Sequence, residues 1–195
     1  PAEAMNWISR ERRAKIARYQ HQKDARRSLA AELLMRRAAV LWLSLRPDRL
    51  SFDHNPYGRP YLANVRHFKF NVSHSGDYVV IAVSRRTVGV DIERIGRCDH
   101  ALADRFFSPA EGRYLRSLPD SERERAFTML WTLKECYTKA EGKGLLIPFS
   151  SFNHHHNSNL PHNNPAVFLY PAAVVLSLLM NQIHCRLMNC QNPFR

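Results

Sequence analysis

The sequence has few cysteines, and their spacing gives no sign of a metal or disulfide framework. Four cysteines occur among 195 residues, and no two of them form a Cys-x-x-Cys pair. They lie at Cys98, Cys136, Cys185 and Cys190. A zinc finger or a disulfide-stapled domain would need paired cysteines at short, regular spacings. We therefore expect a reduced protein of the cytoplasm.

Long apolar segments are also missing. The longest apolar stretch runs from Phe168 to Met180, which is shorter than the roughly 20 residues that a membrane-spanning helix needs. The first residues lack the basic segment followed by an apolar one that marks a secretory signal. We predict a soluble, unsecreted protein without a membrane partner.

Acidic residues are scarce as well. The chain has 17 Asp and Glu against 29 Lys and Arg, which gives a formal net charge of +12. This excess favours an acidic partner, such as nucleic acid, a phosphorylated cofactor, an acidic protein or an anionic membrane. Charge alone does not choose among them. The length suits one generous domain or two small lobes.

The first half of the chain reads as a basic helical region followed by a turn and a strand. Residues 9 to 46 contain no proline, and their apolar residues recur at helical spacings between Arg and Lys. We predict one long or two short amphipathic helices there. The turn formers at residues 54 to 60 end this pattern, and Phe68 to Ser73 is predicted to be a strand.

The second half begins with extended segments and continues with two helices. Tyr78 to Ser84 and Thr87 to Glu93 are apolar, β-branched runs separated by two arginines, so we predict a hairpin. A Ser-Pro-Ala-Glu sequence announces a helix over residues 108 to 118. A further helix is predicted over residues 121 to 141, with Gly142 as its C-terminal cap.

Two carboxylates occur together at the end of a predicted strand. Asp91 and Glu93 are two residues apart, and side chains alternate faces along a strand, so both project to the same side. Mg²⁺ prefers carboxylate and water oxygens and is usually completed by substrate phosphates. The pair is thus a candidate metal site, although a solvated strand end has the same pattern.

A third carboxylate lies on the last predicted helix. Trp131, Glu135 and Lys139 are spaced at i, i+4 and i+8 and share one helix face. Taken alone, Glu135 and Lys139 could equally form an ordinary surface ion pair.

A small polar segment lies at the end of the strand predicted over Phe68 to Ser73. The segment FNVSHSG places Ser73 and Ser75 on either side of His74, directly before Gly76. Such a loop can offer hydroxyls and backbone N–H groups to a phosphate. A structural histidine between two turn-forming serines is the alternative.

Four motifs in order resemble the motif series of the 4′-phosphopantetheinyl transferase superfamily, and in particular its surfactin-synthetase-activating type. They are FNVSHSG at 70–76, GVDIE at 89–93, FFSPAE at 106–111 and WTLKECYTKAEGKGL at 131–145. With the basic helical stretch and the turn before them, the resemblance extends over about residues 9–152.

The resemblance implies an α+β fold of two pseudo-symmetric α/β lobes that bind coenzyme A between them. On this basis we expect an N-terminal lobe at 1–88 and a C-terminal lobe at 89–153. The segment 154–195 is expected to be a divergent or disordered tail.

The resemblance also implies an enzyme that moves 4′-phosphopantetheine from coenzyme A, its co-substrate, onto a serine of an acyl or peptidyl carrier protein. The reaction would depend on Mg²⁺ and release 3′,5′-ADP. We expect a monomer without a nucleic-acid partner. The excess of basic residues would then steer acidic carrier proteins to the enzyme.

Residue roles follow from the matching motif positions. Asp91, Glu93 and Glu135 would hold Mg²⁺, and Glu135 or Glu111 would help to deprotonate the incoming serine. The implied contacts to coenzyme A come from Arg12, Lys15, Arg59, Ser73, His74, Asp91 and Lys139. Within this set, Arg12 and Lys15 would reach the nucleotide 3′-phosphate, and Lys139 the phosphates at the reaction centre. Arg59 stands where the family often has lysine, and its planar fork has a different geometry.

Both ends of the chain depart from the family pattern. The family usually begins with a strand before the basic helix, but only residues 1–8 precede that helix here. The family continues after residue 152 with several strands, whereas this chain has a polar, histidine-rich stretch. The apolar segment at 171–180 could be a strand, a helix or neither. Either the tail is a divergent ending, or an altered reading frame near residue 153 leaves the second lobe incomplete.

Two other functions remain open at this stage. An inactive, truncated relative would only bind coenzyme A or a carrier protein. A nucleic-acid-binding module would use the basic helices, but the sequence resembles no zinc finger or RNP motif.

Overall fold

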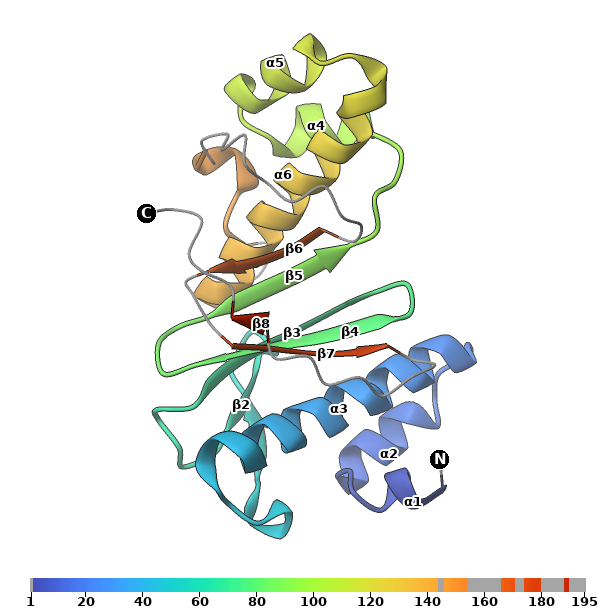
Figure 1. The fold of residues 1–195 in the computed structure, drawn as a ribbon, viewed down its shortest axis with the longest axis vertical. Helices are drawn as coiled ribbons and strands as arrows, with labels where there is room; N and C mark the ends of the chain where they lie inside the picture. Colours follow the sequence, from blue (N-terminus) through green and yellow to red (C-terminus); the bar gives the residue numbers. More distant parts are fainter. Residues whose placement is uncertain (1, 144–145, 154–165, 171–173, 180–187, 190–195) are drawn as a thin grey trace.

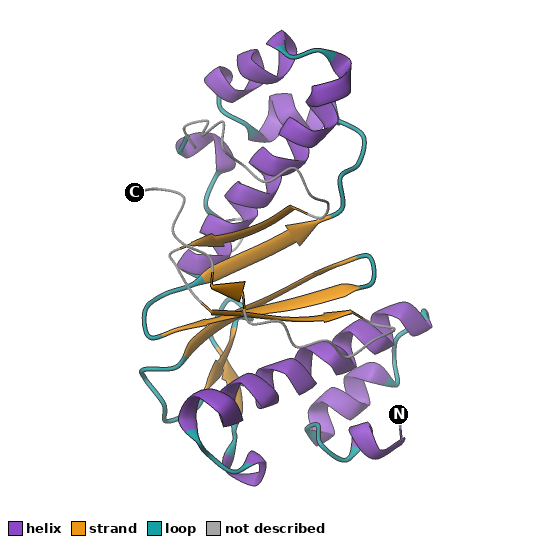
Figure 2. Cartoon of the chain, in the orientation of Figure 1, coloured by secondary structure: helices purple, strands orange, loops and turns teal. Residues whose placement is uncertain are grey.

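The computed structural model describes residues 2–143, 146–153, 166–170, 174–179 and 188–189 (Figure 1). Its elements form four layers, with strands in the middle and helices on both outer sides (Figure 2). Helices α2 and α3 cover one side, and helices α4 to α6 lie on the other. This arrangement confirms the expected α+β class with an N-terminal and a C-terminal lobe.

Basic helices open the chain. A short helix α1, Ala2–Met5, precedes α2, Arg10–Ile16, and α3, Gln22–Leu43. The region predicted as one long or two short helices is therefore two helices, α2 and α3. The hydroxyl of Ser9 caps α2 by accepting the Arg12 N–H, which satisfies one of the free donors at the helix start.

The N-terminal lobe is built on a sheet with the strand order β3-β4-β7-β8. Strands β3, Lys69–Ser75, and β4, Tyr78–Ser84, pair antiparallel, and β7, Val174–Leu179, and β8, Met188–Asn189, extend the sheet. The apolar side of α3 covers one face, with a core of Leu34, Met35, Ala38, Ala39, Phe70, Val79, Ile81 and Val83. Burial of these side chains, worth roughly 1.5–3 kcal/mol for each large one, fixes α3 on the sheet.

A short hairpin stands beside this sheet. Strands β1, Phe52–His54, and β2, Pro60–Leu62, pair antiparallel with His54 opposite Pro60. A 3₁₀ turn, Pro47–Arg49, connects α3 to β1. The turn formers at residues 54–60 thus close a hairpin, as their composition indicates.

The predicted hairpin between residues 78–84 and 87–93 is wrong. Strand β4 forms its hairpin with β3, while β5, Gly89–Glu93, pairs with β6, Ala166–Tyr170, in a separate sheet. The physical reason lies in the turns. Gly76 has a φ of +58° at the first position of a two-residue connection between β3 and β4, whereas the arginine link has no glycine to make such a tight turn.

The C-terminal lobe packs helix α6 against β5, and α5 and α4 follow outward from α6. Helix α4, His100–Phe106, leads to α5, Pro109–Ser117, and then to α6, Asp120–Glu141, which lies along β5. Ser108 and Glu111 form a capping box at the start of α5, and Gly142 caps α6 at a φ of +71°. Both signals are the ones that the sequence predicts.

The segment after residue 153 contributes strands to both sheets. Strand β6 pairs with β5 in the C-terminal lobe, and β7 pairs with β4 in the N-terminal lobe. The apolar stretch whose conformation the sequence left open therefore includes a strand. The histidine-rich residues 154–165 lie outside the described residues.

In the described part of the chain, no helix is both long and apolar enough to cross a membrane.

Candidate active site

Side chains of β3 and β5 meet in the layer between the two sheets. The hydroxyl of Ser73 donates to Asp91 Oδ1 at 2.7 Å, and the hydroxyl of Ser75 donates to Glu93 Oε2 at 3.0 Å. Each serine on this face of β3 is therefore hydrogen-bonded to one carboxylate of β5. Asp91 and Glu93 lie on the same face of β5, and that face looks towards β3.

Helix α6 adds a cation to this group. Lys139 Nζ donates to Asp91 Oδ1 at 2.5 Å and to Ser73 Oγ at 3.1 Å. Asp91 is 1% exposed, and its other oxygen, Oδ2, is buried without a hydrogen-bond partner in the described part of the chain. A buried oxygen of this kind costs free energy unless a ligand or an ion completes it.

Two half-buried carboxylates surround Asp91. Burial, and then the charge of Asp91, raise the pKa of Glu93 above its ordinary value of 4.5. Burial also raises the pKa of Glu135, Lys139 opposes this rise, and the charges of Asp91 and Glu93 add to it. The three carboxylates therefore repel one another across the space between β5 and α6.

The fit of a divalent cation can be judged from these side chains. Among the described residues, no three His, Cys, Asp or Glu side chains converge closely enough to hold a metal ion, and Lys139 takes up Asp91 Oδ1. However, Asp91, Glu93 and Glu135 offer only carboxylate oxygens, which Mg²⁺ prefers. The free Oδ2 atom and the mutual repulsion are both features that a cation would relieve. The donor set fits Mg²⁺.

His74 occupies the opposite side of β3 from Ser73 and is exposed. Desolvation of its ring, and then the nearby charge of Arg27, lower the pKa of His74 below 6.5. A neutral imidazole at pH 7 can donate one hydrogen bond to a phosphate. Arg27 itself donates from Nε to the carbonyl of Gly76 at 2.9 Å.

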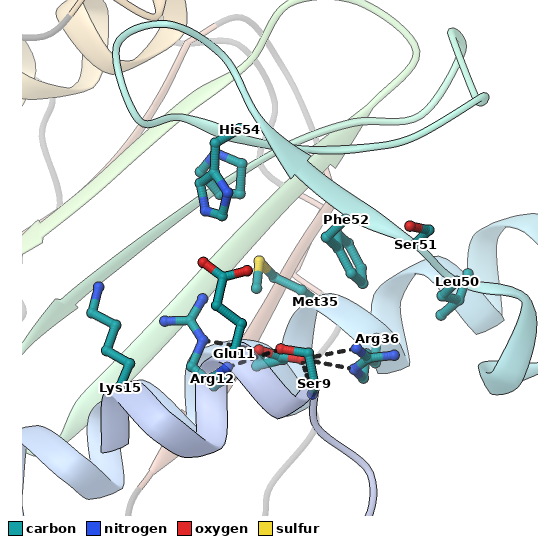
Figure 3. Close-up of a pocket in the computed structure, with 12 residues that line it drawn as sticks. Ser9, Glu11, Arg12, Lys15, Met35, Arg36, Leu50, Ser51, Phe52 and His54 are labelled. Atoms are coloured by element: carbon teal, nitrogen blue, oxygen red, sulfur yellow. Dashed lines mark hydrogen bonds and ion pairs between the residues drawn. The ribbon is translucent and has the colours of Figure 1, made fainter. Parts of the chain in front are cut away.

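Arg12 and Lys15 line a cavity of about 210 Å³ between α2, α3 and β1 (Figure 3). Both side chains, with Glu11, rise from α2, while Phe52 and His54 face them from β1. Lys15 is exposed. The cavity therefore combines the basic groups of α2 and α3 with the carboxylates of Glu11 and Glu32 and a few apolar side chains.

Glu32 holds Arg12 in place at this cavity. This buried carboxylate accepts the Ser9 N–H at 2.8 Å, Arg12 Nε at 2.9 Å and Arg36 Nη2 at 2.8 Å. Arg12 also donates from Nη1 to the hydroxyl of Ser28 at 3.2 Å. The guanidinium is thus fixed on the wall of the cavity by side chains of α3.

Arg59 lies away from the cavity, and its guanidinium meets backbone carbonyls. Nη1 donates to Ala140 O at 2.6 Å, and Nη2 donates to Val88 O at 2.9 Å and to Phe70 O at 3.2 Å. Burial lowers the pKa of Arg59, and Glu141 opposes this effect.

Glu111 also lies outside the group around Asp91. It is 5% exposed, accepts the Ser108 N–H at 2.9 Å and forms an ion pair with Lys134 at 2.9 Å. Lys134 is fully buried and donates to Phe149 O and Phe152 O as well. Glu111 and Lys134 thus tie α5, α6 and the turn after α6 together.

Sequence reasoning missed two contacts in this region. Ser75 was considered as a phosphate donor but donates to Glu93, and the side chain of Asn71, which was not singled out, accepts the Val90 N–H at 2.9 Å. Alternation along β3 places Asn71, Ser73 and Ser75 on one face and could have found both contacts. Lys134 belongs to the quoted motif at 131–145, but its burial could not be predicted, because a lysine on a helix is usually exposed.

Comparison with known proteins assigns the chain to a family. The model of the 4′-phosphopantetheinyl transferase superfamily matches residues 87–182, and the model of the 4′-phosphopantetheinyl transferase N-terminal region matches residues 2–86. The chain belongs to the 4′-phosphopantetheinyl transferase superfamily and to its Sfp type.

Bacterial relatives support this assignment. The chain is 41% identical to 4′-phosphopantetheinyl transferase gsp of Aneurinibacillus migulanus over 74% of its length. It is 36% identical to 4′-phosphopantetheinyl transferase Sfp of Bacillus subtilis over 76% of its length. These matches cover 60% and 66% of the relatives' own lengths.

A solved structure with a similar region is the holo-[acyl-carrier-protein] synthase of Thermotoga maritima. Its TM-score is 0.37 at 22% sequence identity, and the match covers 43% of this chain and 60% of that chain.

Proposed function

We propose that this chain transfers the 4′-phosphopantetheine group of coenzyme A to a serine of an acyl or peptidyl carrier protein. The observation that carries the proposal is the hydrogen-bonded group of buried Ser73 and Asp91 with half-buried Lys139, which lies beside Glu93 and Glu135. In a chain of this superfamily, these are the residue types that bind a metal and a pyrophosphate.

The proposed reaction would use a Mg²⁺ ion. Asp91, Glu93 and Glu135 would hold it, since they are neighbouring carboxylates and Asp91 Oδ2 is buried with no hydrogen-bond partner among the described residues. When bound, Mg²⁺ would neutralise charge on the phosphate oxygens and make the phosphorus easier to attack.

The protein's own groups would bind and orient the two substrates. Lys139 and Ser73 would donate to phosphate oxygens near the reaction centre, and His74 would add a donor from the other side of β3. Arg12 and Lys15 would hold the 3′-phosphate of the nucleotide at the cavity in Figure 3. Such fixed donors stabilise developing charge without reorganisation.

The chemical step is a substitution at phosphorus. The carrier serine Oγ forms a bond to the phosphorus that bears the pantetheine arm, and the bond from this phosphorus to the bridging oxygen breaks. The electron pair stays on that oxygen, and 3′,5′-ADP leaves. Glu135 would accept the serine proton, because burial and neighbouring charges raise its pKa above 4.5. We assign this role to Glu135 and not to Glu111, because Glu111 lies outside the group around Asp91 and pairs with Lys134.

The proposal also covers the setting of the reaction. The carrier protein and coenzyme A are the expected partners, and the expected location is the cytoplasm. The high positive charge supports a partner rich in acidic groups.

A substitution at Asp91 tests the proposal. Asp91→Asn should lower the release of 3′,5′-ADP from coenzyme A and an apo acyl carrier protein by about 100-fold or more, because a metal ligand and the partner of Lys139 are lost together. Asp120→Asn, at a carboxylate that is 92% exposed, is the matched control and should keep full activity. Turnover that survives in a folded Asp91→Asn variant would refute the assigned site.

A further inference from the structure

Three elements that carry the proposed site meet at one guanidinium. Arg59 donates to Ala140 O on α6, to Val88 O directly before β5, and to Phe70 O on β3. Helix α6 carries Glu135 and Lys139, and β5 carries Asp91. The side chain therefore bonds to the backbone of β3 and α6 and to the residue directly before β5, the three elements that hold Ser73, Lys139 and Asp91.

The carbonyl of Ala140 is available because it lies in the last turn of α6. The last four carbonyls of a helix have no partner within the helix, and they carry partial negative charge. A second donor reaches the same helix end, since Asn55 Nδ2 donates to Gly142 O at 3.2 Å. Arg59 and Asn55 thus cap the C-terminus of α6 from another lobe.

The loop that presents Arg59 is itself fixed. Asn55 Oδ1 accepts the N–H groups of Tyr57 and Arg59 at 2.9 and 2.8 Å, and the Asn55 N–H donates to Arg59 O at 2.9 Å. Gly58 supplies the left-handed backbone that the turn needs, with a φ of +82°. Both the N–H and the carbonyl of Arg59 are therefore hydrogen-bonded to Asn55, which fixes the backbone from which the Arg59 side chain extends.

Backbone packing at the same point leaves little freedom. A Cβ atom on Gly89 would lie 2.0 Å from Cys136 O and 2.7 Å from Ala140 N, so β5 touches the backbone of α6 directly. A Cβ atom on Gly142 would lie 3.2 Å from the Arg59 side chain. The backbone of β5 thus approaches α6 closely at Ala140, the residue whose carbonyl Arg59 binds.

We propose that Arg59 is a positioning residue that fixes the end of helix α6 against strands β3 and β5, and so holds Lys139 and Glu135 at Asp91. Three of the five N–H donors of the guanidinium bind these carbonyls. This role differs from that of a ligand to the cofactor. The inference rests on the proposed function, because it concerns the same site.

The expected consequence is a loss of turnover without a loss of cofactor affinity. Lys139 is adjacent to Ala140, so a loose helix end would move its ammonium relative to Asp91. A displacement of about 1 Å can lower the rate of a chemical step by about 100-fold. The cavity around Arg12 and Lys15 does not include Arg59, so binding of the nucleotide end should persist.

The test combines kinetics, binding and hydrogen exchange. In Arg59→Gln we expect kcat to fall about tenfold or more, the KM and Kd for coenzyme A to change by less than about threefold, and amide exchange at residues 139–142 to become about tenfold faster. Arg59→Lys should show a smaller kcat defect than Arg59→Gln, because it keeps a charged donor. Some defect should remain, because one ammonium cannot span three carbonyls. Arg66→Gln, at an exposed arginine, should match the wild type.

Two results would overturn the inference. A Kd for coenzyme A that rises tenfold or more with unchanged exchange would make Arg59 a cofactor ligand. If Arg59→Gln leaves amide exchange, kcat and the Kd for coenzyme A unchanged, Arg59 has no positioning role. If Arg59→Gln does not fold, Arg59→Lys and Asn55→Ala provide the same readouts.

A failure of the proposed function would look different. The wild-type chain would then transfer nothing to the apo acyl carrier protein, yet exchange at residues 139–142 would still respond to Arg59→Gln. Unchanged exchange in that case would overturn the positioning role by itself.

Discussion

Glu32 shows how one buried carboxylate organises the proposed nucleotide end of the site. Burial alone would raise its pKa, but the hydrogen bonds from the Ser9 N–H, Arg36 and Arg12 outweigh burial and lower the pKa below 4.5. Since a lowered pKa means that the charged form is favoured in the folded state, Glu32 stabilises the fold at pH values above the unfolded pKa.

We predict that Glu32→Gln lowers the free energy of unfolding by about 2–4 kcal/mol at pH 7, because two partly buried guanidiniums lose their charged partner. The loss should shrink as the pH falls from about 4.5 through the lower folded pKa, where the wild-type carboxylate is protonated as well. Urea denaturation at pH 7 and at pH 4 or below measures both effects.

The control for Glu32 is an exposed glutamate. Glu122→Gln, on the surface of α6, should change the stability by less than about 0.5 kcal/mol at either pH. An equal loss for Glu32→Gln at both pH values would contradict the role of the charged carboxylate.

Lys15 is the second residue whose role can be isolated. It is exposed at the cavity of Figure 3, so its removal should leave the fold intact. We predict that Lys15→Ala weakens coenzyme A binding about tenfold, which corresponds to about 1.4 kcal/mol, with little change in kcat. Titration calorimetry with Lys23→Ala as the control checks this. A fall in kcat alone would contradict a phosphate contact.

At the scale of elements, the close contact between β5 and α6 depends on Gly89. A Cβ atom there would collide with backbone atoms of Cys136 and Ala140, which cannot rotate away as a side chain can. We predict that Gly89→Ala costs about 2 kcal/mol or more and lowers turnover, because α6 must move away from Asp91.

The matched glycine for this experiment is Gly96, whose Cβ atom would meet nothing closer than 3.8 Å. Gly96→Ala should change the midpoint of thermal unfolding only slightly. Equal melting temperatures for the two alanine variants would show that the close approach of β5 and α6 does not constrain the fold.

Helices were more predictable from the sequence than strand pairing. The capping box of Ser108 and Glu111 and the C-terminal cap at Gly142 are local signals. Helix α5 begins where the first signal places it, and α6 ends where the second does. Pairing is not local. The glycine in the connection at Gly76 was the better hairpin signal. The second partner of β4, strand β7, and the partner of β5, strand β6, come from residues after 165.

The candidate site was predictable where it depends on local patterns along one strand or one helix. Alternation along β5 places Asp91 and Glu93 on one face, and helical spacing brings Lys139 to that group. The environments of Arg59 and Glu111 depend on distant backbone and on the buried Lys134. Sequence spacing contains no information on such contacts.

At the scale of the whole molecule, the two lobes bring their functional groups to the layer between the sheets. The N-terminal lobe supplies Ser73 and Ser75 from β3, and the C-terminal lobe supplies Asp91 and Glu93 from β5. Neither lobe contains the whole group. The site therefore requires both lobes in contact, and the net charge of +12 favours the approach of acidic substrates to it.

The most direct test of this account is the intact mass of an apo acyl carrier protein after incubation with the chain, coenzyme A and Mg²⁺. We predict a mass gain of one phosphopantetheine arm, lost when EDTA is added and lost with Asp91→Asn. No mass gain from a folded wild-type chain, or a gain that persists in EDTA, would contradict the proposed metal-dependent transfer.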